Sequence, residues 1–177
     1  MRGVRRFTRG GEGHLAPGFV EGVRVLGKVG LTCDLAAGHA QLAAATELVR
    51  RCPDVQFMLC HCGVPDIAGG RLESWRADIR ELASLPNVRC KMSGLVTSAN
   101  PDGWTREDLK PAIEHVLECF GFPRTAFGSD WPVMLKAARY PAWVEALRWA
   151  VSGCTEEELR RLFRDSAIEF YRIGPRS

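Results

Sequence analysis

The sequence predicts an α/β fold built on a parallel sheet, and three observations support this class. Short strand-like runs alternate with amphipathic helical stretches along the 177 residues. The composition, 46% hydrophobic and 25% charged, is typical of a globular domain with a substantial core. Polar side chains follow several of the strands, while no glycine-rich nucleotide-binding fingerprint occurs. We therefore expect residues 1–177 to form a single domain.

Each expected element rests on its own pattern. The strands are short apolar runs, at Val4–Phe7, Leu31–Ala36, Val55–His61, Val88–Met92 and Ala126–Gly128. The helices repeat apolar residues near 3.6-residue spacing, at Pro17–Val29, Gln41–Arg51, Leu72–Leu85, Leu109–Phe120 and Ala142–Val151. A last helix is expected from the capping box Thr155–Glu158, with Asp165 capping a final turn.

The polar residues beyond the strands narrow the fold. They include Arg5, His39, His61, Lys91 and Asp130, each at or just past a strand. Reactive side chains at the C-terminal ends of several parallel strands are typical of the mouth of a (β/α) barrel. An open sheet also places ligands at strand ends, so the pattern favours a barrel and leaves the open sheet as an alternative.

Charge and cysteine content limit the functional classes. A net charge of +3, without a basic tail or stripe, gives no indication of a nucleic-acid or membrane-surface partner. No stretch approaches the roughly 20 continuous apolar residues of a membrane helix. The seven cysteines include no C-x-x-C pair, which favours reduced thiols in a cytoplasmic enzyme.

The stretch Cys60-His61-Cys62 looks like a metal clamp. Side chains alternate across a strand, so His61 is expected to point away from both cysteines while extended geometry lasts. Zinc motifs also usually separate paired cysteines by two to four residues. We expect the cysteines to pack as small buried hydrophobes. A thiol or zinc protein built on them is kept as an alternative.

Asp130 and His61 are the expected catalytic residues. Asp130 stands in F-G-S-D-W-P-V, directly after an apolar strand, where a carboxylate can act as general base or hard-metal ligand. A turn cap is the ordinary alternative for this aspartate. His61 ends the run V-Q-F-M-L-C, and its ordinary alternative is a hydrogen-bonded core histidine. Its place at a strand end favours function.

Four further residues are candidates for contacting substrate. Lys91 shares a strand face with Ser93, and a lysine there must be paired or reach a cavity. A substrate carboxylate and a structural ion pair are equally compatible with that position. Arg5 raises the same question, His39 follows a strand, and Trp131 can wall a pocket beside Asp130.

Five motifs occur in the order seen in one known family. They are G-V-R-R (3–6), D-L with H-x-Q-L (34–42), H-x-G-x-P-D-I (61–67), C-K-M-S-G-L-V-T (90–97) and F-G-S-D-W-P-V (127–133). Over nearly its whole length the chain resembles amidohydrolase-related proteins of the L-fuconolactonase and 2-pyrone-4,6-dicarboxylate lactonase type. The resemblance implies a TIM (β/α)8-barrel hydrolase that opens a lactone of a sugar acid or related carboxylate.

The resemblance also implies roles for individual residues. Asp130 would activate water, and His61 would polarise the lactone carbonyl, directly or through one divalent metal such as Zn²⁺ or Mn²⁺ held by His61 and Asp130. Members with and without a metal both exist, so the metal stays open. Arg5, His39 and Lys91 would grip substrate oxygens.

Two departures from the family pattern matter. The family usually has Asp-His where this chain has Cys60-His61, and its first-strand H-x-H pair is missing. The recognisable part corresponds to about the last five strand–helix units, so we expect an incomplete, N-terminally truncated barrel with unpaired edges. We therefore expect this chain alone to be a poor catalyst or to fold only marginally. A catalytically impaired fragment or binding module and a decarboxylase on the same scaffold remain alternatives.

Overall fold

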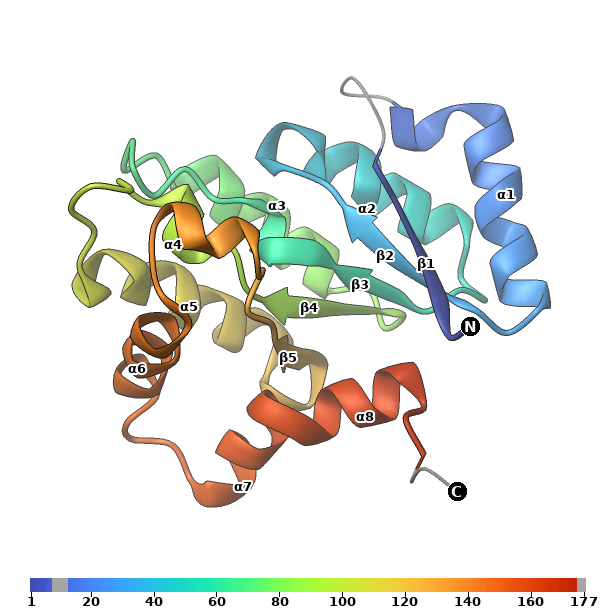
Figure 1. Cartoon of the computed structure of the whole chain (residues 1–177). Helices are drawn as coiled ribbons and strands as arrows, with labels where there is room; N and C mark the ends of the chain where they lie inside the picture. The colour runs from blue at the N-terminus through green and yellow to red at the C-terminus, as the bar shows by residue number, and fades with distance from the viewer. Residues whose placement is uncertain (8–12, 175–177) are drawn as a thin grey trace.

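The computed structural model describes residues 1–7 and 13–174, and its centre is one parallel sheet (Figure 1). Its strands are β1 (Gly3–Phe7), β2 (Thr32–Ala36), β3 (Phe57–Leu59), β4 (Val88–Met92) and β5 (Thr125–Phe127). They lie in the order β1-β2-β3-β4-β5, and every neighbouring pair is parallel. Sequential order with parallel neighbours is how a (β/α) barrel is wound, whereas a doubly wound sheet reverses its order.

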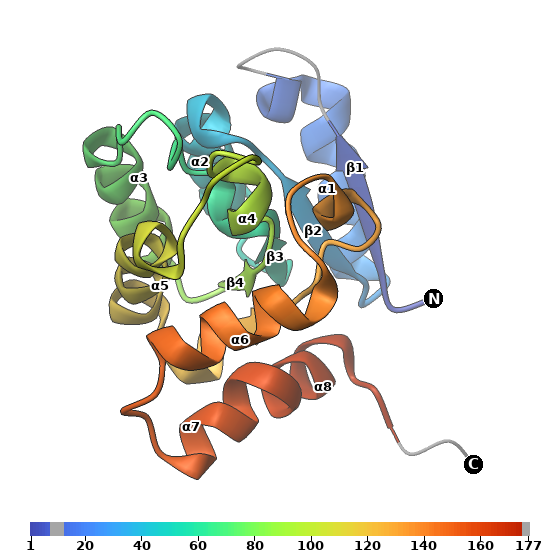
Figure 2. The same cartoon turned by 60° about the vertical axis from the view of Figure 1, so that its left-hand side comes forward.

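Eight α-helices are present in the described part of the chain. They are α1 (Pro17–Lys28), α2 (Leu42–Arg51), α3 (Glu73–Ala83), α4 (Leu95–Ser98), α5 (Arg106–Phe120), α6 (Tyr140–Ala150), α7 (Glu156–Arg160) and α8 (Ser166–Tyr171). Helices α1, α2, α3 and α5 cover one face of the sheet (Figures 1 and 2), which we call the outer face. None of the helices in residues 13–174 is both long and apolar enough to cross a membrane.

Side-chain alternation gives the two faces of the sheet different chemistry. Apolar residues of the strands point to the outer face and form the core with the helices; they include Leu35, Phe57, Leu59, Cys90 and Met92. Met58 and Ala126 point to the opposite, inner face, where they pack against Phe170 of α8. Helix α8 therefore lies across the inner face, on the side of the sheet away from α1–α3 (Figure 2).

The structure corrects several expected elements. Strand β3 ends at Leu59, so the expected strand to His61 is too long. Helix α5 begins at Arg106, earlier than expected, because Thr105 and Asp108 form a capping box. Asp165 stands directly before α8, which ends at Tyr171, but its side chain makes no capping hydrogen bond there, and a π-helical stretch, Arg161–Asp165, joins α7 to α8. The short α4 carries too few residues to produce a periodic signal.

Candidate active site

His61 lies in a tight turn, Cys60–Gly63, that begins directly after β3. His61, Cys62 and Val64 have φ angles of 55°, 52° and 52°. Gly63, which lies among them, has a φ angle of 71°. Non-glycine residues avoid this left-handed region because Cβ crowds the backbone, and a β-branched valine avoids it most. The turn thus removes His61 from the alternation that an extended strand would impose.

Two contacts from the core hold this turn in place. The indole N–H of Trp75, on α3, donates a 2.8 Å hydrogen bond to the carbonyl of Cys62. Gly63 lies so close to Leu42 that a Cβ atom added to the glycine would come within 2.8 Å of a leucine methyl carbon. Strained backbone persists only where its surroundings over-determine it. Trp75 and Leu42 supply that constraint from two different helices.

Asp130 occupies a second left-handed position, in the loop after β5. Its φ angle is 61°, and the Trp131–Pro132 peptide bond that follows is cis. The buried Trp143 of α6 donates its indole N–H to the carbonyl of Gly128 over 3.0 Å. A buried tryptophan therefore anchors each of the two strand ends that present His61 and Asp130. Neither hydrogen bond could be predicted, because an indole N–H contact leaves no pattern in the sequence.

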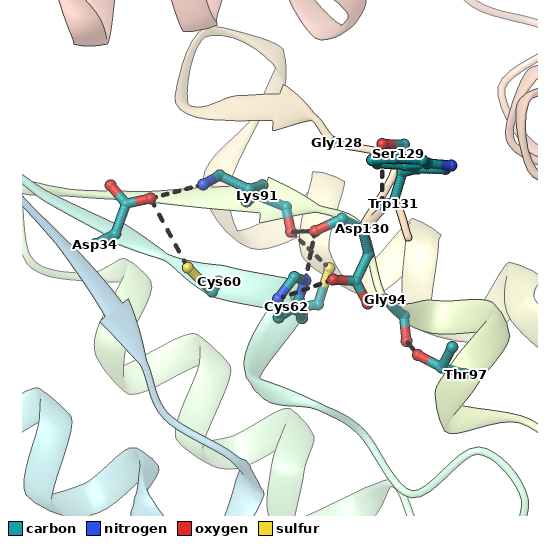
Figure 3. Close-up of polar contacts among 12 residues, drawn as sticks. Asp34, Cys60, Cys62, Lys91, Gly94, Thr97, Gly128, Ser129, Asp130 and Trp131 are labelled. Carbon is teal, nitrogen blue, oxygen red and sulfur yellow. Dashed lines mark hydrogen bonds and ion pairs between the residues drawn. The ribbon is translucent and has the colours of Figure 1, made fainter. Parts of the chain in front are cut away.

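The two strand ends bring His61 and Asp130 into contact. His61 Nε2 lies 3.4 Å from Asp130 Oδ1, and their side chains are 18% and 14% exposed. On the other side of the ring, His61 Nδ1 lies 2.9 Å from the hydroxyl oxygen of the fully buried Ser93. Gly94 packs on the same ring, since a Cβ atom there would lie 2.9 Å from the ring carbon Cγ of His61. Figure 3 shows the Asp130 side chain, with its contacts drawn as dashed lines.

The charge state of His61 follows from its surroundings. Burial lowers the pKa of His61 from its ordinary 6.5; Asp130 acts in the opposite direction, and Arg5 and Lys91 add to the lowering. The ring is therefore neutral near pH 7. A neutral imidazole donates a hydrogen bond from one nitrogen and accepts one at the other.

Lys91 is already paired within the inner face. Its Nζ lies 2.7 Å from Asp34 Oδ2, and the Tyr171 hydroxyl of α8 lies 2.9 Å from each oxygen of that carboxylate. In Figure 3, Asp34 and Lys91 point toward one another. Burial lowers the pKa of Lys91, but Cys60 and Asp34 outweigh burial, so the net pKa is raised and the ammonium stays charged. Sequence reasoning missed Asp34 and Tyr171, although Asp34, a carboxylate within an apolar strand, raises the same question as Lys91.

The other residues expected to contact substrate do not all lie beside His61 and Asp130. Arg5 is paired in register with Asp34 and lowers the pKa of His61, which places its charge on the inner face. His39 lies against α3 instead, where its Nε2 is 3.1 Å from the Ser74 hydroxyl and 3.8 Å from Asp78. Trp131 follows Asp130 directly and is 68% exposed. Arg5 and Lys91 thus act on His61 electrically, whereas the His39 side chain contacts Ser74 and Asp78 of α3.

Strand alternation would place the two cysteines beside His61 on the same face, but in the structure they lie on different faces. Cys60 Sγ lies 3.9 Å from Asp34 Oδ2 on the inner face. Cys62 Sγ lies 3.7 Å from Met92 Sδ, within the outer-face core. The expectation that both cysteines lie opposite His61 is therefore wrong, because the left-handed turn begins one residue after Cys60.

His61 and Asp130 are the two expected site residues in contact here, and both are of types that can bind a metal ion. Within residues 1–7 and 13–174, no three His, Cys, Asp or Glu side chains lie close enough together to hold one ion. A catalytic zinc site normally takes three protein ligands. The described residues therefore supply an incomplete ligand set.

These features place the chain in a known class. It belongs to the amidohydrolase family, whose sequence profile matches residues 1–173. It is 35% identical over 150 residues to an L-fucono-1,5-lactonase from Burkholderia ambifaria, covering 81% of this chain and 50% of that protein. The expected membership in the lactonase-like amidohydrolases and the α/β barrel-type fold are both confirmed.

Solved structures agree on the fold. An amidohydrolase from Burkholderia multivorans, crystallised with zinc, has a TM-score of 0.92 at 32% identity over 98% of this chain and 65% of that chain. A 5-carboxyvanillate decarboxylase from Sphingomonas paucimobilis has a TM-score of 0.61 at 15% identity over 98% of this chain and 59% of that chain, which indicates shared fold alone. The chain spans about half the length of the curated relatives it matches, 57% and 50% for two of them. Its five strands thus correspond to part of the barrel-type sheet.

Proposed function

We propose that this chain carries the His61–Asp130 part of an active site that hydrolyses a lactone of a sugar acid or related carboxylate. The observation that carries the proposal is the 3.4 Å contact between His61 Nε2 and Asp130 Oδ1 at the ends of two strands. Identity of 35% to an L-fucono-1,5-lactonase supports a sugar lactone as substrate. The left-handed backbone at both residues supports a functional role, because such strain concentrates at active sites.

In the proposed reaction Asp130 is the general base. Its carboxylate removes a proton from water, and the water oxygen attacks the lactone carbonyl carbon to give a tetrahedral intermediate. His61 polarises the carbonyl by donating a hydrogen bond to its oxygen. The ring carbon–oxygen bond then breaks, and the departing oxygen takes the proton from Asp130. The product is a hydroxy acid, and the base is regenerated.

Two cationic side chains of the inner face, Arg5 and Lys91, act on His61, and the Lys91 charge is partly neutralised by Asp34. Such charges favour a substrate or product carboxylate. We propose that Arg5 contacts substrate oxygens and that Lys91, held by Asp34, contributes mainly through its charge. Trp131 is proposed to wall the pocket, and His39 is kept as a more distant candidate contact.

A metal-dependent route stays an alternative within the same proposal. The zinc ion in the Burkholderia multivorans structure is a property of that protein. Zn²⁺ or Mn²⁺ bound by His61 and Asp130 would need further ligands, because the described residues supply no third. A divalent ion, when bound, supplies Lewis-acid activation of the carbonyl or of water.

Turnover measurements separate these possibilities. We would express the 177-residue chain and the longest in-frame product of its gene that contains it. Acid release from a panel of sugar-acid lactones would be followed with and without Zn²⁺ or Mn²⁺. We expect lactone opening by the longer product, and slow opening or none by the 177-residue chain.

Three results would change the proposal. Carbon dioxide release from an aromatic carboxylate, with lactones untouched, would favour the decarboxylase. No turnover by either product would favour a catalytically impaired fragment or binding module. Rapid turnover by the 177-residue chain would contradict the expectation that this part of the site works poorly alone.

A further inference from the structure

Ser93, His61 and Asp130 form a continuous line of contacts. The Ser93 hydroxyl oxygen lies 2.9 Å from one ring nitrogen of His61, and Asp130 lies 3.4 Å from the other. Serine hydrolases arrange the same three residue types in the same order, and such triads are recognised by geometry, not by sequence position. The role of Ser93 therefore depends on which end of this line of contacts a substrate can reach.

The burial of Ser93 excludes it as the nucleophile. Ser93 has no exposed surface, whereas the side chains of His61 and Asp130 are 18% and 14% exposed. Gly128 also packs on the serine, because a Cβ atom there would lie 3.2 Å from Ser93 Cβ. A substrate carbonyl can approach the Asp130 end of the line and cannot reach Ser93. Ser93 consequently has the place of the group that orients the histidine.

We propose that Ser93 is a positioning residue that holds His61 in the neutral tautomer protonated at Nε2. A serine hydroxyl has one proton to donate. The hydroxyl oxygen of Ser93 lies 2.9 Å from His61 Nδ1 and 3.5 Å from the carbonyl oxygen of Lys91. The shorter contact makes Nδ1 the favoured acceptor, which leaves the ring proton on Nε2.

The other end of the ring leads to the same tautomer. Asp130 Oδ1 lies 3.4 Å from Nε2. With Nε2 protonated, an N–H group faces the carboxylate and both ring nitrogens have partners of opposite character. With the proton on Nδ1, a bare nitrogen lone pair would face the carboxylate, and two acceptors at this separation repel one another.

This inference deepens the proposed function and rests on it for its catalytic meaning. A histidine protonated at Nε2 can donate that proton in a hydrogen bond to a lactone carbonyl. The alternative tautomer leaves Nε2 free to bind a metal ion. Ser93 would thereby favour direct polarisation over the metal-assisted route.

The tautomer can be read without turnover. We would record two-bond nitrogen–proton correlations of the histidine rings in the ¹⁵N-labelled 177-residue chain at pH 7.5, and identify His61 by the resonances lost in His61→Gln. We expect an unprotonated Nδ1 and a protonated Nε2 in the wild type. A proton on Nδ1, or on both nitrogens, would overturn the assigned tautomer.

Variants test whether Ser93 is responsible. In Ser93→Ala we expect the Nε2-protonated fraction of His61 to fall at least about twofold, because Nδ1 loses its donor. Ser98→Ala is the matched control, since its hydroxyl bonds the Gly94 carbonyl in the adjacent turn and does not contact the ring. An unchanged His61 spectrum in Ser93→Ala would overturn the role of Ser93, and Ser93→Gly replaces it if the alanine variant fails to fold. A wild-type protein that has the assigned His61 tautomer but opens no lactone would count against the proposed function alone.

Discussion

At the scale of single residues, the two proposed catalytic side chains share an unusual backbone. His61 and Asp130 are both non-glycine residues with positive φ, at 55° and 61°. Such positions cost on the order of 1–3 kcal/mol each. Strain of this kind aims each side chain away from the direction that its strand would give it. The backbone conformation at the two proposed catalytic residues thus lowers the stability of the fold.

Val64 allows this strain to be measured without touching the catalytic pair. It has a φ angle of 52° and is 45% exposed. We expect Val64→Gly to raise the free energy of unfolding by about 1 kcal/mol, because glycine accepts this conformation. Val133→Gly is the control, since Val133 is equally exposed but does not have a positive φ. Chemical denaturation measures both, and destabilisation by Val64→Gly would argue against strain in the turn.

Lys91 illustrates a second residue-scale prediction. Lys91→Met leaves the Asp34 carboxylate without its ammonium partner, and both side chains are at most 20% exposed. We expect a loss of about 3–5 kcal/mol in the free energy of unfolding. Arg71→Met, which removes an ion pair at an 80% exposed arginine, should cost under about 1 kcal/mol. Equal losses in the two variants would show that the Lys91 pair is solvated like a surface pair.

Residue types and positions pointed to His61 and Asp130, yet the sequence could not predict how they are oriented. The alternation rule placed His61 correctly opposite Cys62 but wrongly opposite Cys60 as well. A left-handed turn of non-glycine residues has no compositional signal, because its conformation comes from tertiary contacts. The hydroxyl of Ser93 was likewise visible only as a residue sharing a face with Lys91.

At the scale of elements, two helices fix the ends of two strands. Trp75 on α3 bonds the Cys62 carbonyl, and Trp143 on α6 bonds the Gly128 carbonyl. Both side chains are almost completely buried, at 0% and 1% exposure. Helical periodicity predicted these helices and their buried faces correctly. It could not predict the hydrogen bonds, because the spacing of apolar residues indicates which face of a helix is buried but not which polar atom that face contacts.

Removing one indole N–H tests this anchoring. We expect Trp75→Phe to lower the free energy of unfolding by about 1–3 kcal/mol, because the buried Cys62 carbonyl loses its donor. The ring signals of His61 should also shift, since His61 precedes Cys62. Trp149→Phe is the matched control, because its indole ring contacts the side chains of Arg106 and Lys110 at the edge of the fold. Equal effects of the two substitutions would contradict a specific anchor.

At the scale of the whole molecule, α8 joins the end of the chain to the inner face. Phe170 packs on Met58 and Ala126, and Tyr171 bonds Asp34. The strand–helix alternation predicted the parallel sheet, and the polar residues at the strand ends favoured a barrel. Neither pattern predicted that a short helix crosses to the opposite face, because a six-residue segment carries too few positions to indicate which surface it covers.

This junction predicts a loss of stability at alkaline pH. Burial raises the pKa of Tyr171 above its ordinary 10.0, and Asp34 adds to the rise while Lys91 opposes it. The pKa of Lys91 is also raised from 10.5. Both groups bind their protons more tightly in the folded protein than in the unfolded chain. Their contribution to the free energy of unfolding is therefore fully present below about pH 10, and it is lost as pH rises through the pKa values of the folded protein. Denaturation as a function of pH should show a weaker alkaline slope in Tyr171→Phe; an unchanged slope would contradict this origin.

The measurement that tests the central claim most directly is lactone opening by the Asp130→Asn variant. It would be made on the longest in-frame gene product that contains this chain, with wild type and Asp130→Asn assayed side by side at equal folded concentration. Removing a general base should reduce the turnover number by about 10²–10⁴-fold, while the circular dichroism spectrum stays the same. An Asp130→Asn variant that opens sugar lactones as fast as the wild type would contradict the account.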